Sequence, residues 1–162
     1  MFFIDDAIDP YYIYEYYSRI NKYFHEQVSQ GASYTDFYPA RNLTLDDDDK
    51  IIKMVQDVLE SKLRVRLTCY QAELQTWPIG VDSPLHVHEK SGGREKGDYN
   101  SLLYLNDNFE DGEFYTSHGV TIKPKKNRLT FFDGKNIPHG VKQIYGHHRY
   151  SVIFWWINTK HE

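Results

Sequence analysis

Two histidines separated by one residue, His86 and His88, are the side chains of this sequence best suited to bind a metal ion. They lie in the segment PLHVH, which has the character of a β-strand, and alternate side chains of a strand point to the same face. A histidine pair of this kind is more often a surface feature than a metal site. His139, about fifty residues downstream, supplies a third candidate ligand where a neighbouring strand would return beside the first.

Arg149 and Ser151 follow His139 at a spacing that places both on one face of a further strand. A guanidinium can bind a carboxylate through two hydrogen bonds, and a serine hydroxyl adds a neutral donor. The segment RYSVIFWW is otherwise strongly apolar, so the arginine is expected to be buried and to need an anionic partner. The sequence therefore predicts an anion site beside a metal site.

The composition limits which classes of protein can carry such a site. With 162 residues, 40% of them apolar, the chain is expected to form a single domain, residues 1–162, around one core. Cys69 is the only cysteine, so a metal must be held by histidine and carboxylate side chains. The net charge of −4 leaves no broad basic surface, which argues against nucleic acid as a partner.

The N-terminal residues and the hydropathy pattern indicate a protein without membrane association. No apolar run approaches the ~18 residues of a membrane span, and the first residues, MFFIDDAIDPYY, carry three aspartates where a signal peptide has cations. The expected location is the cytoplasm.

The elements that must position these residues are two helices followed by short strands. Residues 1–63 contain two amphipathic patterns, one after Asp9-Pro10 and one after the run 46–49, whose carboxylates are expected in the first helical turn. Residues 64–158 contain eight strand-like segments, and aromatic residues make up 16% of the chain. We predict an α+β, mainly β fold: a double-stranded β-helix, or jelly roll, with the N-terminal helices packed on one sheet.

The order of these motifs resembles the 2-oxoglutarate and Fe(II)-dependent oxygenases, in particular the prolyl 4-hydroxylase-like branch and its short microbial and viral members. The resemblance covers roughly residues 65–157. It is carried by His86, the YLND segment 104–107, Gly112-Glu113, the segment 122–134, Pro138-His139, and Arg149 with Ser151.

This resemblance implies a jelly roll whose open end holds Fe(II) and 2-oxoglutarate. His86, His88 and His139 would be the metal ligands, with no catalytic side chain beyond them. The distal carboxylate of 2-oxoglutarate would be held by Arg149 and Ser151, helped by the Tyr104 hydroxyl and, more weakly, by Trp77 as a pocket aromatic. The implied reaction is hydroxylation of a prolyl or other residue in a peptide or protein, with succinate and CO2 as co-products. Ascorbate is a further reductant to test.

One position departs from the family pattern, which has His-x-Asp or His-x-Glu where this chain has His86-Val87-His88. Strand geometry favours His88 as the third ligand, because residues two apart share a face. Charge favours Glu89, one residue further, because a carboxylate offsets the metal cation and an imidazole does not. Both alternatives stay open at this point.

The same departure keeps two other classes of protein in consideration. Gly80 followed by His86-x-His88 resembles the opening of a cupin motif, although Glu89 and Glu95 fit the cupin glutamate poorly and Arg149 has no role there. A member of the oxygenase fold that has lost catalysis is the other alternative.

The charged loop 89–98, with two adjacent glycines, is expected to close over the substrate.

Overall fold

The computed structural model describes residues 1–37, 42–87 and 98–158. Two α-helices, one short 3-10 helix and a series of short strands alternate along this part of the chain. Their bounds are β1 Phe2–Ile4, α1 Pro10–Ser29, η1 Tyr34–Phe37, β2 Leu43–Thr44, α2 Lys50–Leu63, β3 Leu67–Trp77, β4 Ser83–His86, β5 Tyr99–Tyr104, β6 Glu110–Asp111, β7 Phe114–Thr116, β8 Thr121–Ile122, β9 Leu129–Phe132, β10 His139–Val141, β11 Ile144–Tyr145 and β12 Arg149–Asn158.

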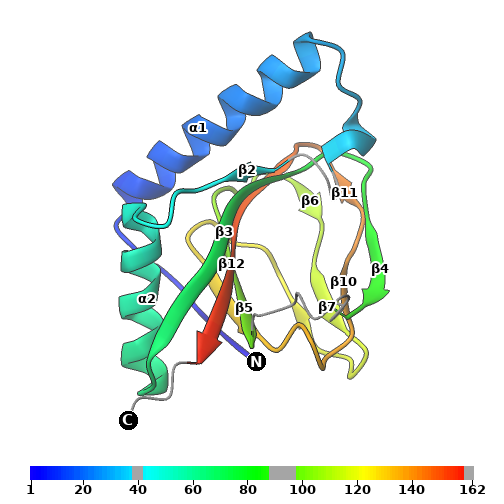
Figure 1. Ribbon diagram of the computed structural model, residues 1–162. Coiled ribbons are helices and arrows are strands. Elements are labelled where there is room, and N and C mark those ends of the chain that lie inside the picture. Colours follow the sequence, from blue (N-terminus) through cyan, green and yellow to red (C-terminus); the bar gives the residue numbers. More distant parts are fainter. Residues whose placement is uncertain (38–41, 88–97, 159–162) are drawn as a thin grey trace, which may run out of the picture.

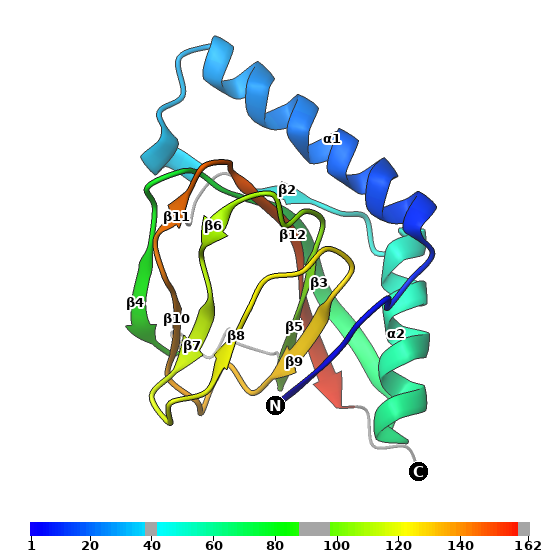
Figure 2. The same cartoon turned by 180° about the vertical axis from the view of Figure 1, so that it is seen from behind.

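The strands form a jelly roll built from two facing antiparallel sheets. The larger sheet has the order β1-β9-β5-β12-β3-β2, and the smaller sheet has the order β4-β10-β7-β8, with β11 and β6 forming a separate pair. Figure 1 shows β4, β7 and β10 across from β3, β5 and β12, and the view from behind in Figure 2 shows the same two layers. The predicted fold class, including helices on one sheet, is confirmed.

The two helices cover the outer face of the larger sheet, and their first turns are fixed by aspartate caps. The side chain of Asp9 accepts a hydrogen bond from the Tyr11 amide, and Pro10 occupies the first turn of α1. Asp49 caps α2 in the same way through the Ile51 amide. Asp49 also accepts a hydrogen bond from the hydroxyl of Tyr16, which ties α1 to the start of α2.

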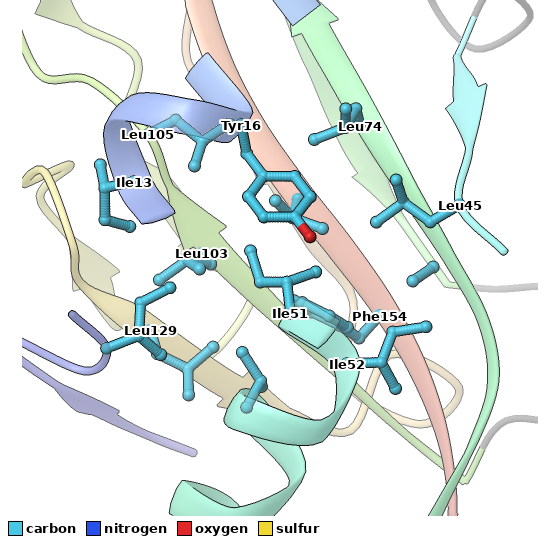
Figure 3. Close-up of a cluster of buried hydrophobic side chains, with 14 of the residues drawn as sticks. Ile13, Tyr16, Leu45, Ile51, Ile52, Leu74, Leu103, Leu105, Leu129 and Phe154 are labelled. Atoms are coloured by element: carbon cyan, nitrogen blue, oxygen red, sulfur yellow. The ribbon is translucent and has the colours of Figure 1, made fainter. Parts of the chain in front are cut away.

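The main hydrophobic core lies between these helices and the sheet. On β12 the alternate residues Tyr150, Val152, Phe154 and Trp156 belong to this core, and all four are fully buried. Figure 3 shows Tyr16 of α1 among side chains contributed by α2 and by the strands. Because successive strand residues point to opposite faces, the intervening residues of β12 face the interior between the two sheets.

The structure corrects two details of the sequence-based prediction. The carboxylates of residues 46–49 do not lie in the first turn of α2; they precede the helix, and Asp49 is its cap. The segment expected to be helical, residues 1–63, also supplies β1 and β2 to the larger sheet. Over the described residues, neither helix is long and apolar enough to span a membrane.

His148 is buried, although its place beside His147 in a polar turn predicts exposure to solvent. Its side chain is 9% exposed, and its ring lies 4.6 Å from that of Phe24 and 5.0 Å from that of Tyr34. Its Nδ1 accepts a hydrogen bond from the Ile79 amide at 3.0 Å. The aromatic side chains of α1 and η1 therefore enclose a histidine that precedes the predicted anion-binding strand.

We expect the free energy of unfolding to decrease as the pH falls from about 6.5 to about 4. Burial, followed by the charges of His147 and His25, lowers the pKa of His148 to about 4. In the unfolded chain this histidine binds a proton near pH 6.5, so protonation favours unfolding by about 1–3 kcal/mol across that window. Urea unfolding at pH 7.5 and 4.5 measures the difference. His148→Asn, which keeps an acceptor, should reduce this difference in unfolding free energy, whereas His118→Asn, at an exposed turn, should not. If neither variant changes the difference, His148 is not its cause.

Candidate functional site

His86 and His139 are brought together by the pairing of β4 with β10 in the smaller sheet. The two residues are register partners, and their ring centroids lie 4.6 Å apart with the ring planes inclined at 53°. The next residue, Gly140, makes this close approach feasible, because a Cβ atom there would lie 2.5 Å from the Ser83 carbonyl oxygen. The histidines that the sequence separates by about fifty residues therefore lie side by side.

The hydrogen bonds of both imidazoles favour the tautomer that a metal ligand needs. His139 Nδ1 lies 2.8 Å from the Ile137 carbonyl oxygen, and His86 Nδ1 lies 2.9 Å from the Pro84 carbonyl oxygen. A carbonyl oxygen only accepts, so each Nδ1 carries the proton and each Nε2 carries the lone pair. Metal-binding histidines are commonly oriented by this kind of bond to a backbone carbonyl.

The two candidates for the third ligand belong to a segment that the structure does not describe. His88 and Glu89, the two alternatives from the sequence, lie outside the described residues, as does the loop expected to close over the substrate, apart from Asp98. Within the described ranges, no three histidine, cysteine or carboxylate side chains gather into a metal-binding group. The structure thus brings two of the predicted ligands together, and variants must decide the third.

Arg149 is the cationic residue of the site, and it is almost completely buried. It begins β12 as the register partner of Trp77 on β3, and its side chain is 1% exposed. Its Cζ atom lies 4.7 Å from the centroid of the Trp77 ring and 5.5 Å from that of Tyr104. These aromatic contacts stabilise a guanidinium, but a charge at this depth is costly unless an anion approaches it.

Ser151 lies two residues after Arg149 on β12, and it faces Tyr104 on the neighbouring strand β5. They are register partners, both are fully buried, and neither hydroxyl has a hydrogen-bond partner among the described residues. Burial raises the pKa of Tyr104, so its hydroxyl stays protonated and can donate. Two buried donors without acceptors are costly, and this indicates that a ligand oxygen is meant to approach them.

A cavity of about 250 Å³ between the sheets contains the two imidazoles and the guanidinium. Its other lining side chains are Asn42, Glu73, Gln75, Trp77, Leu102, Phe114, Phe132, Val141, Ile153 and Trp155. Of the predicted cofactor-binding residues, Arg149 and Trp77 line this cavity, whereas Ser151 and Tyr104 do not. Two imidazoles and a buried arginine fit a divalent metal together with a small dicarboxylate. The residues present therefore fit Fe(II) and 2-oxoglutarate.

A second cavity, of about 430 Å³, lies elsewhere and does not contain these groups. It is lined by side chains around the start of α1 and the residues after β5, including Asp6, Tyr14, Tyr17 and Asp107. No histidine or arginine of the described chain lines it. The larger cavity thus has carboxylates but lacks the imidazoles and the guanidinium, which line the smaller one.

Several cavity residues lie on strands that the sequence predicts but were not among the predicted site residues. Glu73 and Gln75 lie on β3 at alternate positions before Trp77, so the two-residue period of that strand was sufficient to place them in the same cavity. On β12 the same period places Trp155 on the strand face that carries Arg149. Asn42 gave no such signal, because it enters the cavity from a separate segment before β2.

The chain is similar in sequence to vertebrate prolyl 3-hydroxylases over part of its length. It is 42% identical to prolyl 3-hydroxylase 2 of Rattus norvegicus and of Homo sapiens over 65 residues, which is 36% of this chain and 9% of each relative. The chain therefore spans about a tenth of the length of these relatives.

Solved structures of prolyl hydroxylases share its fold. A Trichoplax adhaerens prolyl hydroxylase in complex with a hypoxia inducible factor peptide fragment has a TM-score of 0.72 at 18% identity, over 97% of this chain and 83% of that one. A Pseudomonas putida prolyl-4-hydroxylase has a TM-score of 0.71 at 15% identity, over 98% and 92%. A viral collagen prolyl hydroxylase from Paramecium bursaria Chlorella virus 1, in its 2OG complex, has a TM-score of 0.68 at 16% identity, over 98% and 96%.

The sequence profile of one family covers the strands that carry the site. Residues 74–157, more than half of the chain, match the 2OG-Fe(II) oxygenase superfamily, and this range includes His86, His139, Arg149 and Ser151. The chain belongs to the 2OG-Fe(II) oxygenase superfamily.

Proposed function

We propose that this protein is an Fe(II)- and 2-oxoglutarate-dependent hydroxylase of a prolyl residue in a peptide or protein. The observation that supports it most directly is the buried Arg149, which lines the same cavity as His86 and His139 and lies 5.5 Å from the Tyr104 ring. Membership of the oxygenase superfamily and the likeness to prolyl hydroxylases support the same reaction.

Each side chain has a definite task in this proposal. His86 and His139, with His88 or Glu89, hold Fe(II) through Nε2 lone pairs and the third ligand. Arg149 binds the distal carboxylate of 2-oxoglutarate, and the two buried hydroxyls donate to it. When bound, Fe(II) and 2-oxoglutarate would supply, with O2 as the oxidant, decarboxylation to succinate and CO2 coupled to hydroxylation, one oxygen atom entering succinate and the other the substrate.

The remaining walls of the cavity exclude water from the reacting groups. Phe114 and Phe132 lie 5.4 and 5.0 Å from the His139 ring, and Leu102 and Ile153 continue the apolar surface toward the larger sheet. An apolar wall strengthens the interaction of the guanidinium with a carboxylate. It also limits the reach of solvent to the metal.

The comparisons favour two positions of hydroxylation on the proline ring. The resemblance to short prolyl 4-hydroxylases favours C4, whereas the local sequence identity to prolyl 3-hydroxylases favours C3. Proline-containing peptides incubated with Fe(II), 2-oxoglutarate and O2, with and without ascorbate, should gain one oxygen atom. Mass spectrometry detects this gain, and NMR of the product distinguishes C3 from C4.

Anaerobic titration separates the proposed enzyme from its alternatives. Addition of Fe(II) and then 2-oxoglutarate should give the weak visible charge-transfer band of an iron-chelated keto acid. A metal that binds without producing this band would favour the cupin-like or non-catalytic alternative. A band without hydroxylation of any peptide would keep the cofactor assignment and reject the prolyl substrate.

Tyr104→Phe should weaken 2-oxoglutarate binding roughly 3- to 10-fold. The variant removes one buried donor, and a hydrogen bond of this kind contributes about 1 kcal/mol. Fe(II) affinity should be unchanged, because Tyr104 is the register partner of Ser151 and its ring lies 5.5 Å from the Arg149 Cζ atom, and none of these three residues is a proposed metal ligand. Calorimetric titration measures the change, with Tyr14→Phe on the exposed face of α1 as the matched control. An unchanged 2-oxoglutarate affinity would remove Tyr104 from the site.

The third metal ligand is identified by comparing His88→Ala with Glu89→Ala. The variant that removes a true ligand should lower Fe(II) affinity roughly a hundredfold, since even residues that only orient a ligand change affinity by 10- to 100-fold. The other variant should bind Fe(II) almost as tightly as the unmodified protein. Equal small effects of both would show that neither residue completes the site.

A further inference from the structure

Glu73 is a carboxylate with a fixed orientation inside the cavity. Its Oε1 atom accepts a hydrogen bond from Asn42 Nδ2 at 3.0 Å, and its Oε2 atom accepts one from Gln71 Nε2 at 2.5 Å. A carboxylate has about four acceptor positions, so two amide donors orient it and leave capacity for a further donor. No lysine or arginine within residues 1–37, 42–87 and 98–158 forms an ion pair with it.

The strand register places Glu73 well away from the arginine of the cofactor site. Glu73 is the partner of Ile153, and Arg149 begins β12 four residues earlier. At ~3.3 Å per residue the two positions are about 13 Å apart along the strand. The cavity therefore has a cationic end that suits 2-oxoglutarate and an anionic end that the proposed reaction does not use.

Trp155 adds an aromatic surface at this anionic end. It is the register partner of Gln71, which is the residue that orients Glu73, and it lines the same cavity. Glu73 and Trp155 are thus diagonal neighbours on one face of the β3–β12 pair, within reach of one side chain placed between them. A carboxylate next to an indole attracts a cation by charge and through the ring face.

We propose that Glu73 and Trp155 form a subsite for a lysine or arginine side chain next to the target prolyl residue of the substrate. This proposal rests on the proposed function for the peptide and adds a requirement on its sequence. The guanidinium of Arg149 repels a second cation at the cationic end of the cavity, so the positive side chain of the substrate is directed to Glu73 at the other end.

The test uses blocked peptides that differ in one residue beside a central proline. Lysine, glutamine or glutamate is placed on either side of the proline, and binding to the protein loaded with Fe(II) and 2-oxoglutarate is measured under anaerobic conditions. A lysine peptide should bind at least tenfold more tightly than its glutamine counterpart. Glu73→Gln should remove that preference, and Glu73→Lys should transfer it to the glutamate peptide. Glu26→Gln, on the exposed face of α1, is the control for a general change in charge.

The outcomes separate this proposal from the proposed function. Equal binding and hydroxylation of all three peptides would overturn the subsite while leaving the hydroxylase intact. A lysine preference that depends on Glu73 without any hydroxylation would support the subsite and reject the hydroxylase. If Glu73→Gln instead weakens Fe(II) or 2-oxoglutarate binding in the titration above, Glu73 belongs to the cofactor site and the subsite is overturned.

Discussion

Replacement of Arg149 by glutamine should abolish most of the affinity for 2-oxoglutarate and leave Fe(II) binding nearly intact. Loss of one partner from a buried charge pair costs about 2–5 kcal/mol, which is roughly a 30-fold or larger loss of affinity. Arg149 is 1% exposed, so water cannot replace the missing guanidinium. The visible band of the iron-chelated keto acid should therefore appear only at much higher 2-oxoglutarate concentration.

A thermal measurement provides an independent readout for the same variant. A ligand at 100 times its Kd stabilises the folded state by about 2.7 kcal/mol, so 2-oxoglutarate at that concentration should raise the Tm of the unmodified protein much more than that of Arg149→Gln. Arg19→Gln is the matched control, because Arg19 pairs with Asp49 on the outer helices. Equal losses of 2-oxoglutarate and Fe(II) affinity in a folded variant would reject the assignment of Arg149.

His139→Ala should lower Fe(II) affinity by roughly a hundredfold or more, and with it the chelation of 2-oxoglutarate. In the proposed metal site this imidazole supplies one of the metal bonds, so its loss should exceed the 10- to 100-fold effect of residues that only orient a ligand. His86→Ala should behave alike, since the two rings lie 4.6 Å apart. Anaerobic titration with Fe(II), followed by metal analysis after desalting, measures the effect.

Two further variants distinguish loss of a ligand from loss of structure. His139 is 4% exposed and packs against Phe114 and Phe132, so alanine leaves a cavity, whereas His139→Gln keeps most of the volume. His139→Ala and His139→Gln should both lose Fe(II). His118→Ala, in an exposed turn, should keep it. Stoichiometric Fe(II) binding by a folded His139→Gln protein would remove His139 from the metal site.

The parts of this site that the sequence predicted are those governed by local periodicity. Arg149 and Ser151 share a strand face, and the two N-terminal helices follow their apolar spacing and their aspartate caps. Contacts between distant segments were not predictable in this way. The burial of His148 depends on Phe24 and Tyr34, more than a hundred residues earlier, and the orientation of Glu73 depends on Asn42.

β12 serves two surfaces at once, since its alternate residues belong to the helix-covered core and to the cavity. A one-residue insertion or deletion between 149 and 153 would exchange these two sets. Arg149 or Ser151 would then enter the apolar layer beneath the helices, while an apolar side chain would take its place on the interior face. Substitutions can therefore alter the core and the proposed cofactor site one at a time, but a change in strand length disrupts both. The number of residues in this strand is as strongly constrained as their identity.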